Sequence, residues 1–367
     1  MSESESVINA AGKLTALGGS AQSADVAAAQ AEAAGRHVDL QRLRQRAGDR
    51  IAELTGAEAA CVTTGAAAGI TIGIAAILCR ENPDLLTRLP VLPSPRHVIL
   101  QAGHAISFGA TIEQMIQLSG ATPRITGTRD RVTGDDLSSA IDVDVAAMLF
   151  VQSHHCVQEN MVNLEDFIAC ARSQDLPVIV DAAAEEDLTW YIRAGADLVT
   201  YSGGKAFGGP TTGFITGRAE LIELCEAQFT GIARTMKVGK EQIAGLLTAL
   251  DRYANADQTA IRDLWRHRNQ RLLSSLVNSR IYAAYLKPDE AGRDFDRVAL
   301  IPGTDDKGRL SYEPQQLVSF LAGNTPSIRT RNHHISENIV LVDPRELSEE
   351  DLQQVIDRLL AFEPASV

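Results

Sequence analysis

Short apolar runs alternate with longer amphipathic segments through the middle of this chain. Between residues 51 and 250, the apolar runs are rich in β-branched residues, whereas the segments between them carry helical periodicity. The clearest strands are expected at residues 97–101, 146–151, 177–181 and 197–201. This alternation is typical of an α/β domain with a mostly parallel central sheet.

The pattern is different at both ends of the chain. Residues 1–50 are expected to form an extended arm and a helix. After about residue 255, a charged helix at 257–277 precedes strand-like pieces such as 297–301, and the chain ends with an amphipathic helix at 349–362. We therefore expect three parts: an N-terminal arm and helix at 1–50, a large domain at 51–254 and a smaller C-terminal α+β domain at 255–367.

Composition and charge narrow the class of protein. The 367 residues, 45% of them hydrophobic, are enough to bury a substantial core. The 34 basic and 47 acidic side chains give a formal charge of −13, which opposes binding to nucleic acid. The apolar run from Ala66 to Leu78 is too short to cross a bilayer, and the N-terminus lacks a basic signal-peptide start. Five scattered cysteines indicate reduced thiols. We expect a cytoplasmic protein that binds neither nucleic acid nor membrane.

One lysine lies in a glycine-rich segment, Ser202-Gly203-Gly204-Lys205. The segment follows an apolar run and precedes a second strand-like run at 213–217. Glycines let the backbone approach a bulky planar group, and an amine among small and apolar residues loses its proton readily enough to attack an aldehyde. Lys205 is therefore a candidate Schiff-base lysine for pyridoxal 5′-phosphate. The alternative is a glycine-rich hairpin with a solvated lysine.

An acid ends the apolar run upstream of this lysine. The run predicts a buried parallel strand with Asp181 at its carboxyl end, where ligands of open α/β sheets bind. An aspartate at this place can pair with the pyridinium nitrogen of pyridoxal phosphate and keep it protonated. The interval between Asp181 and Lys205 leaves room for a helix at 184–194 and one more strand. The alternative role of Asp181 is a helix N-cap.

A phosphate site is expected where the strand-like run 59–63 leads into an alanine-rich helix that continues to about Leu78. Backbone N–H groups at a helix start bind phosphate, aided by the helix dipole. The predicted cradle consists of Thr64, Gly65, Ala66 and Ala67, with the added hydroxyl of Ser202. The alternative is close packing of small residues between the helix and the sheet.

Several short segments occur in an order that resembles one enzyme family. They are residues 7–10, 35–40, 63–68, 103–104, 180–183 and 202–205. The set is similar to the SelA-like (selenocysteine-synthase-like) family of fold-type I pyridoxal-phosphate enzymes, and within it to the D-glucosaminate-6-phosphate ammonia-lyase branch. The resemblance implies the fold-type I PLP-dependent transferase fold, a Schiff base on Lys205, Asp181 on the ring nitrogen, and a homodimer or a larger assembly of dimers.

The same resemblance implies a reaction. It is the α,β-elimination of a hydroxylated amino acid, a phosphorylated amino sugar acid such as D-glucosaminate 6-phosphate, to a 2-keto-3-deoxy acid and ammonia. Lys205 is the expected base at Cα, and either His104 or Lys205 protonates the departing hydroxyl. The alternatives are a racemase or transferase acting on a free amino acid, or a seryl-tRNA selenium transferase-like enzyme. The acidic charge and the early start of the family-like segment, at Val7, count against the last one.

Histidines follow two of the predicted strands. His104 follows the strand at 97–101, where fold-type I enzymes commonly offer a ring that stacks on the cofactor, and imidazole also exchanges protons near neutral pH. Its alternative role is to cap the next helix. His154 and His155 follow the strand at 146–151 and are expected near the cofactor or substrate. No acidic or cysteine partner at ligand spacing accompanies them, so no metal is expected.

An arginine of the C-terminal domain is expected to bind the substrate carboxylate. Fold-type I enzymes usually carry one there, and a guanidinium binds a carboxylate through two parallel hydrogen bonds. Arg329 is the first choice, and a solvated basic strand is the alternative. The resemblance also implies that Asn9, Lys13 and Thr15 reach an active site, of their own or a neighbouring subunit.

Overall fold

The computed structural model describes residues 7–153, 155–290, 292–304 and 309–364. The chain divides into a large unit, Gln22–Asn255, and a C-terminal unit that combines Met1–Ala21 with Ala256–Val367. One division thus falls beside the boundary expected near residue 254, whereas the first 50 residues are shared between the two units. None of the helices in the described part of the chain has the length and apolar character that a membrane crossing requires.

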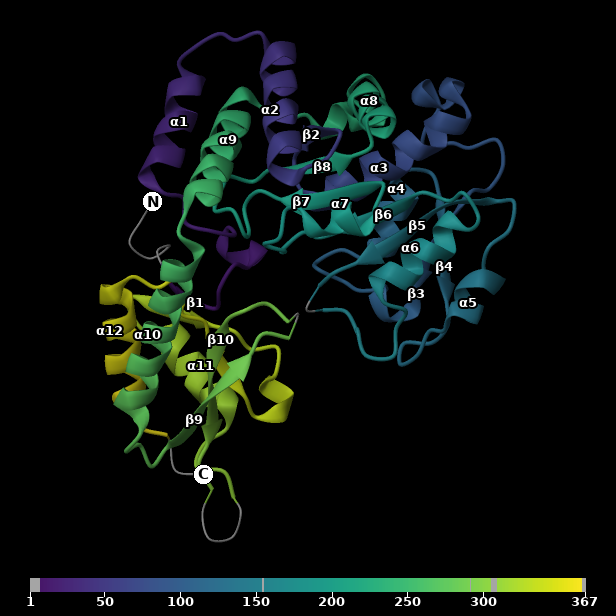
Figure 1. Ribbon diagram of the computed structural model, residues 1–367. Helices are drawn as coiled ribbons and strands as arrows, with labels where there is room; N and C mark the ends of the chain where they lie inside the picture. The colour runs from purple at the N-terminus through teal and green to yellow at the C-terminus, as the bar shows by residue number, and fades with distance from the viewer. Residues whose placement is uncertain (1–6, 154, 291, 305–308, 365–367) are drawn as a thin grey trace. The chain divides into compact units, whose positions relative to one another are not determined.

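A seven-stranded sheet forms the centre of the large unit in the part of the chain that the structure describes (Figure 1). Only β8 runs antiparallel to its neighbours there, so the expected mostly parallel sheet is confirmed. In spatial order the strands are β2 (Ala59–Thr63), β8 (Gly213–Gly217), β7 (Leu198–Ser202), β6 (Val178–Asp181), β5 (Val145–Val151), β3 (His97–Gln101) and β4 (Thr122–Thr126).

Helices cover both faces of this sheet. One face packs against α2, α5, α6, α7 and α9, and the other against α3, α4 and α8. Helix α3 is apolar on all sides because it contacts the sheet together with α4 and α8. Helix α1 packs against α9 (Figure 1). The bounds are α1 (Ala24–Ala34), α2 (Leu40–Thr55), α3 (Ala66–Glu81), α4 (Ile112–Leu118), α5 (Gly134–Ser139), α6 (Leu164–Arg172), α7 (Trp190–Ala194), α8 (Ala219–Ala227) and α9 (Lys240–Asn255).

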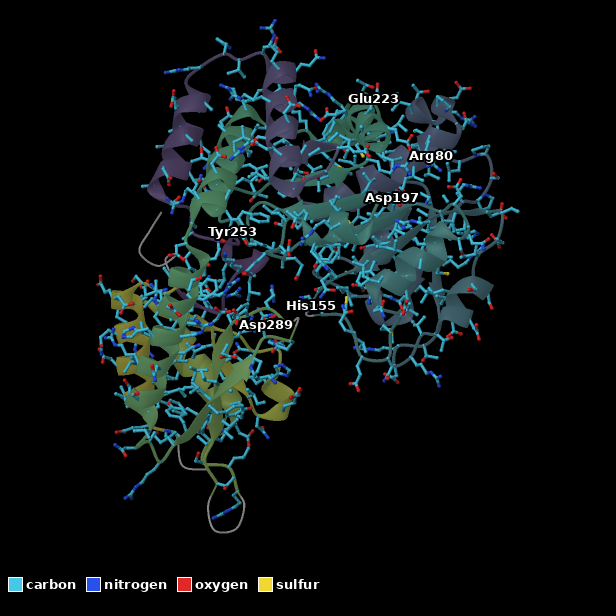
Figure 2. The ribbon with its side chains drawn as sticks, viewed as in Figure 1. Arg80, His155, Asp197, Glu223, Tyr253 and Asp289 are labelled. Atoms are coloured by element: carbon cyan, nitrogen blue, oxygen red, sulfur yellow. The ribbon has the colours of Figure 1, made fainter. Side chains whose placement is uncertain are left out.

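The helix expected at 184–194 is wrong in its first half, because α7 begins only at Trp190. Asp187 Oδ1 accepts from the N–H of Trp190 at 2.9 Å, which fixes a turn before the helix. The backbone carbonyls of Glu186 and Asp187, which precede the helix, accept hydrogen bonds from side chains of other elements. The Tyr201 hydroxyl donates to the Asp187 carbonyl at 2.9 Å, and the Tyr253 hydroxyl donates to the Glu186 carbonyl at 2.7 Å (Tyr253 is labelled in Figure 2). Tertiary contacts therefore replace helical hydrogen bonds here.

The C-terminal unit contains two small sheets and three long helices in its described residues. The first sheet is antiparallel and follows the order β12 (Val340–Val342), β10 (Asp296–Pro302) and β9 (Tyr282–Pro288). The second pairs β1 (Val7–Ala10) in parallel with β11 (Ser327–Thr330). The helices are α10 (Gln258–Leu276), α11 (Pro314–Gly323) and α12 (Glu349–Leu360). The N-terminal strand is thus part of the C-terminal unit.

Candidate active site

Lys205 lies in the turn that joins β7 to β8, beyond the carboxyl end of β7. Gly203 opens this turn, and its N–H donates to the Thr212 carbonyl at 2.8 Å. A Cβ atom at position 203 would lie 2.2 Å from Thr212 Oγ1, so this close approach requires glycine. Lys205 is half-buried. The predicted glycine-rich turn between two strands is confirmed.

Few other lysines compete for a role in this unit. The chain has only six, which are Lys13, Lys205, Lys237, Lys240, Lys287 and Lys307. Lys240 Nζ donates to the carbonyls of Ala33, Ala34 and Arg36 at 2.6–2.9 Å, so this lysine caps the C-terminal end of α1. Lys205 instead follows a strand of the central sheet.

Asp181 is the last residue of β6, the strand beside β7. Its side chain is buried, with Oδ1 accepting from the Ala183 N–H at 3.2 Å. Burial raises the pKa of Asp181 to about 6, and the positive charge of Lys205 opposes this shift. The carboxylate and the ammonium therefore interact at the carboxyl edge of the sheet, as expected from their positions at the ends of adjacent parallel strands.

Three strands bring the predicted phosphate cradle to the same edge. Thr63 at the end of β2 is paired with Gly213 of β8, and Gly213 is paired in turn with Ser202 of β7. A Cβ atom at Gly213 would lie 2.6 Å from the Gly65 carbonyl carbon, so the start of α3 packs directly on this row. Ser202, a half-buried residue, lies three positions before Lys205. The cradle and the lysine are thus neighbours across the sheet.

The first turn of α3 presents backbone N–H groups at this edge. The Gly69 N–H makes the first intrahelical bond, to the Gly65 carbonyl at 3.0 Å, so the N–H groups of Ala66 and Ala67 precede the ladder. Thr63 Oγ1 donates to the Gly65 carbonyl at 2.9 Å and orients the helix start, which follows directly on Thr64. A Cβ atom at Gly65 would meet no atom within 4 Å. This helix N-terminus is open and positively polarised, which suits a phosphate group.

His104 is buried after β3, at the end of a short 3₁₀ helix, Ala102–His104. Its Nδ1 accepts from the Val151 N–H at 3.2 Å, and its ring meets Phe150 edge-on with centroids 4.6 Å apart. Nε2 is buried without a hydrogen-bond partner in the described residues. Burial lowers the pKa of His104 to about 4, and the nearby Gln158 only partly offsets this effect. The imidazole is therefore neutral near pH 7, with its proton on Nε2.

The loop after β5 reaches the same region. His154 lies outside the described residues, whereas His155, labelled in Figure 2, is exposed. Cys156 was not predicted as a site residue, yet it lies close enough to Asp181 for the carboxylate charge to change the pKa of its thiol. Burial raises the pKa of the Cys156 thiol, and the charge of Asp181 raises it further. Its position just after a sheet strand was the available signal.

The two arginines after α11 differ in their surroundings. Arg329 is exposed on β11, opposite Asn9 of β1. Arg331 is only 5% exposed, and its Nε is buried without a hydrogen-bond partner in the described part of the chain. Burial lowers the pKa of Arg331 to about 10, and repulsion from Arg297 adds to this effect. Arg331 thus carries a buried donor that finds no partner among the described residues.

The residues of the N-terminal arm that the sequence singled out have contacts of their own within the C-terminal unit. Asn9 donates to the Gly12 carbonyl at 3.0 Å and accepts from the Ala11 N–H at 3.0 Å, closing a turn. Lys13 forms an ion pair with Glu346 at 3.8 Å. Thr15 begins a 3₁₀ helix, Thr15–Leu17. A role for these residues in an active site stays a prediction.

Comparison with known families identifies the chain. The family model for SelA, described as L-seryl-tRNA selenium transferase, matches residues 7–274. The chain belongs to the SelA family. The resemblance read from the motifs is thereby confirmed, over most of the length on which it was expected.

Relatives within and around this SelA family carry different activities. D-glucosaminate-6-phosphate ammonia lyase of Salmonella typhimurium is 37% identical over 354 residues, covering 96% of this chain and 94% of the relative. The 5'-C-glycyluridine monooxygenase-decarboxylase of a Streptomyces species is 38% identical over 358 residues, covering 96% and 88%. The L-seryl-tRNA(Sec) selenium transferase of Geotalea daltonii is 24% identical over 349 residues, covering 86% and 71%.

Solved structures agree on the fold. A structure of D-glucosaminate-6-phosphate ammonia-lyase matches with a TM-score of 0.86 at 36% identity, covering 96% of this chain and 94% of that chain. Serine palmitoyltransferase from Sphingomonas wittichii matches with a TM-score of 0.59 at 16% identity, covering 95% and 85%. This SelA-family chain is therefore a fold-type I enzyme that depends on pyridoxal phosphate, as predicted.

The residues present fit that cofactor. The open first turn of α3 offers amide donors and room for a phosphate beside Gly65. Asp181 offers a buried carboxylate for a protonated ring nitrogen, and Lys205 offers an amine within electrostatic reach of it. These are the three groups that pyridoxal phosphate requires of a protein.

Proposed function

We propose that this chain is a pyridoxal-phosphate-dependent ammonia-lyase that acts on a hydroxylated amino acid, with a phosphorylated amino sugar acid such as D-glucosaminate 6-phosphate as the substrate. The observation that carries the proposal is the 37% identity to D-glucosaminate-6-phosphate ammonia lyase over 96% of this chain and 94% of that enzyme. The net reaction converts the substrate to a 2-keto-3-deoxy acid and ammonia. The Cα proton and the Cβ hydroxyl leave as water, and a second water molecule hydrolyses the resulting imine to the keto acid and ammonia.

The chain's residues divide the work at the edge of the sheet. The amides of Gly65, Ala66 and Ala67, with Thr64 and the Ser202 hydroxyl, hold the cofactor phosphate. Asp181 is ionised above pH 6 and holds a proton on the ring nitrogen. When bound, the cofactor supplies an electron sink for the electrons of the Cα–H bond. Lys205 attaches the cofactor and, once the substrate amine has displaced it, takes the proton from Cα.

Lys205 is also the better donor for the departing hydroxyl. The sequence left this role open between His104 and Lys205. A histidine with a pKa of about 4 has lost its imidazolium proton near pH 7, and the remaining N–H is too weak an acid to protonate the hydroxyl. We assign His104 a positioning role, with its Nε2–H as a neutral donor, and leave both proton transfers to Lys205. Stacking of the His104 ring on the cofactor stays a prediction.

Arg331 replaces Arg329 in the proposal as the residue that binds a substrate anion. Its Nε, buried without a hydrogen-bond partner in the described residues, supports this choice, whereas Arg329 is exposed.

A dimeric, cytoplasmic enzyme completes the proposal. The family resemblance supports the dimer, and the free thiols of the cysteines in the described residues fit a reducing compartment. Light scattering of the purified holoenzyme, which measures the mass of the assembly, tests the dimer.

The test of the proposed reaction is product analysis with a panel of substrates. Purified holoenzyme is incubated with D-glucosaminate 6-phosphate, D-glucosaminate, serine and a glycyl nucleoside, while ammonia, keto acid, α-proton exchange and oxygen uptake are measured. Equal amounts of ammonia and keto acid from the first compound are expected. Proton exchange or inversion of a free amino acid without ammonia would favour a racemase. Oxygen uptake with the nucleoside would favour the chemistry of the Streptomyces relative, which is equally similar in sequence.

A further inference from the structure

Two adjacent histidines and a glutamate converge in the C-terminal unit, where the histidines follow shortly after Arg331 in sequence. Glu290 follows β9 and lies next to Asp289, which is labelled in Figure 2. His333 and His334 follow β11 and precede the 3₁₀ helix Ile335–Glu337. His333 Nε2 and His334 Nε2 lie 3.1 and 3.0 Å from the same oxygen, Glu290 Oε1. The three ligand atoms all lie within 4.8 Å of one another.

His334 has a carboxylate at each ring nitrogen, an arrangement that either a doubly protonated or a metal-bound imidazole satisfies. Its Nδ1 lies 2.8 Å from Glu337 Oε1, and its Nε2 lies 3.0 Å from Glu290 Oε1. A neutral imidazole has one N–H, so it can donate to only one of these carboxylates. With the proton on Nδ1, donated to Glu337, the Nε2 lone pair faces Glu290. A metal ion between them turns this repulsion into two coordinate bonds, and a carboxylate behind the other ring nitrogen is typical of metal-bound histidine.

Two of the three spacings between the ligand atoms agree with a small coordination sphere. Zinc binds histidine nitrogen and carboxylate oxygen at about 2.0–2.1 Å, so neighbouring ligand atoms of a tetrahedral site are about 3.3 Å apart. The two contacts to Glu290 Oε1, at 3.0 and 3.1 Å, are within a few tenths of an ångström of that edge. Three protein ligands leave room for water.

The surrounding charges allow a second cation. Arg297 Nη1 lies 3.1 Å from Glu290 Oε2, whereas the histidines contact Oε1. The same guanidinium also contacts the buried carboxylates of Asp289 and Asp343, each at 2.9 Å. Asp289 and Asp343 also pair with Arg293 and Arg345, at 2.8 and 2.9 Å, so Arg297 is one of several counter-charges, and Glu290 Oε1 faces the two histidines.

We propose that Glu290, His333 and His334 bind one divalent ion of the zinc class. Two imidazoles and one carboxylate suit borderline ions such as Zn²⁺ and Co²⁺, whereas Mg²⁺ and Ca²⁺ prefer all-oxygen sites. The ion joins the loop after β9 to the turn after β11, and so stabilises the C-terminal unit. The site was not expected from the sequence, because Glu290 and the histidine pair are far apart along the chain.

Calorimetric titration of the tag-free holoenzyme with Zn²⁺, after dialysis against a chelator, tests the proposal. We expect one Zn²⁺ per chain for the wild type, and roughly tenfold or greater loss of affinity in His333→Ala, His334→Ala and Glu290→Gln. The Glu337→Gln variant should bind Zn²⁺ roughly tenfold more weakly, because Glu337 orients His334 without being a ligand. His267→Ala, which removes an exposed histidine of α10, is the matched control and should bind like the wild type.

A second measurement keeps the test decisive if a variant folds poorly. Glu290→Gln also removes a partner of Arg297, so far-ultraviolet circular dichroism must first show that it folds. If it does not, His333→Ala decides, because this side chain is more exposed than those of the other two ligands. Co²⁺ should give visible absorption at wavelengths beyond the cofactor band in the wild type and not in His333→Ala. Absence of Zn²⁺ binding, or binding unchanged in the histidine variants, would overturn the proposal. The two histidines would then be held by hydrogen bonds to the carboxylates alone.

Discussion

The chemistry of the site depends on how burial changes individual side chains. Burial raises the pKa of Asp181 and lowers the pKa of His104, so both groups favour their neutral forms. For Asp181 this shift opposes the ionised state that pairs with a protonated ring nitrogen. For His104 it reinforces the neutral state. Near pH 7, Asp181 is therefore mostly ionised and His104 is neutral.

Replacing Asp181 with asparagine should stabilise the apoenzyme in a pH-dependent way. Below the unfolded pKa of 3.8, both states are protonated and the carboxyl costs nothing; between pH 3.8 and about 6 the unfolded state ionises first, so wild-type stability falls. Above pH 6 the loss is complete, at about 3 kcal/mol for a pKa raised from 3.8 to about 6.

The difference in free energy of unfolding between Asp181→Asn and wild-type apoenzyme, measured with denaturant, should therefore grow from pH 4 to pH 6 and then level off. Turnover of the reconstituted variant should fall by roughly a hundredfold or more, because a neutral amide cannot retain the ring proton. Near-native turnover, or a stability difference independent of pH, would mean that Asp181 only orients the loop that follows it.

A matched pair of arginine variants tests anion binding in the C-terminal unit. Arg331→Met should raise KM for a phosphorylated amino acid by roughly tenfold or more, because a buried charged donor is lost, while Arg329→Met should change it little. Steady-state kinetics of both variants on D-glucosaminate 6-phosphate give the comparison. If Arg329→Met has the larger effect, the original choice from the sequence was the better one.

At the scale of elements, the active site is a row of strand ends capped by one helix. The register Thr63, Gly213, Ser202 places the start of α3 next to the strand that leads to Lys205. Thr200 Oγ1 on that same strand donates to the Ala66 carbonyl at 3.2 Å, which ties the helix to β7. Phosphate binding and lysine chemistry thus depend on one piece of sheet geometry.

The Gly65→Ala variant tests phosphate binding by the helix start separately from folding. A Cβ atom at Gly65 meets no protein atom within 4 Å, so the substitution should leave the stability of the apoenzyme within about 0.5 kcal/mol of wild type. The methyl group would instead occupy space beside the phosphate, and affinity for pyridoxal phosphate should fall roughly tenfold.

Gly134→Ala is the matched control, because Gly134 also begins a helix and has open space around its Cβ position. Fluorescence titration of the apoproteins with the cofactor measures both affinities. Equal affinities for the two variants would show that the phosphate does not lie at this helix start.

Local sequence predicted the elements best where tertiary contacts agree with it. The strands that end at Asp181 and before Lys205 follow from apolar runs, and the glycine-rich turn follows from its composition. Helix 184–194 was half wrong because side chains of Tyr201 and Tyr253 bind its expected backbone groups from other elements. The preference for Arg331 could not be predicted either, because Arg329 and Arg331 lie two positions apart and differ only in what covers them.

At the scale of the whole molecule, the start of the chain belongs to its C-terminal unit. Strand β1 pairs with β11, and the Asp343 N–H donates to the Ala10 carbonyl at 2.8 Å. Ile8 is buried among residues of α10, α11 and α12. The C-terminal core is therefore built from segments at both ends of the sequence, which the hydrophobic pattern alone did not indicate.

Ile8→Ala should weaken the C-terminal unit by about 2–4 kcal/mol, since it removes buried methylene groups and leaves a cavity. Val277→Ala, at a residue 75% exposed in the same unit, should have little effect. Denaturant unfolding of both variants gives the comparison, and equal stability would show that the N-terminal strand adds little to this core.

In the proposed enzyme, Lys205 holds the cofactor beside Asp181. Borohydride reduction of the native holoenzyme, followed by peptide mass spectrometry, tests it most directly because reduction fixes the cofactor on the lysine that carries it. We expect the pyridoxyl mass on Lys205 alone among the six lysines, and no label in Lys205→Ala. Label on another lysine, or label that persists in the variant, would contradict it.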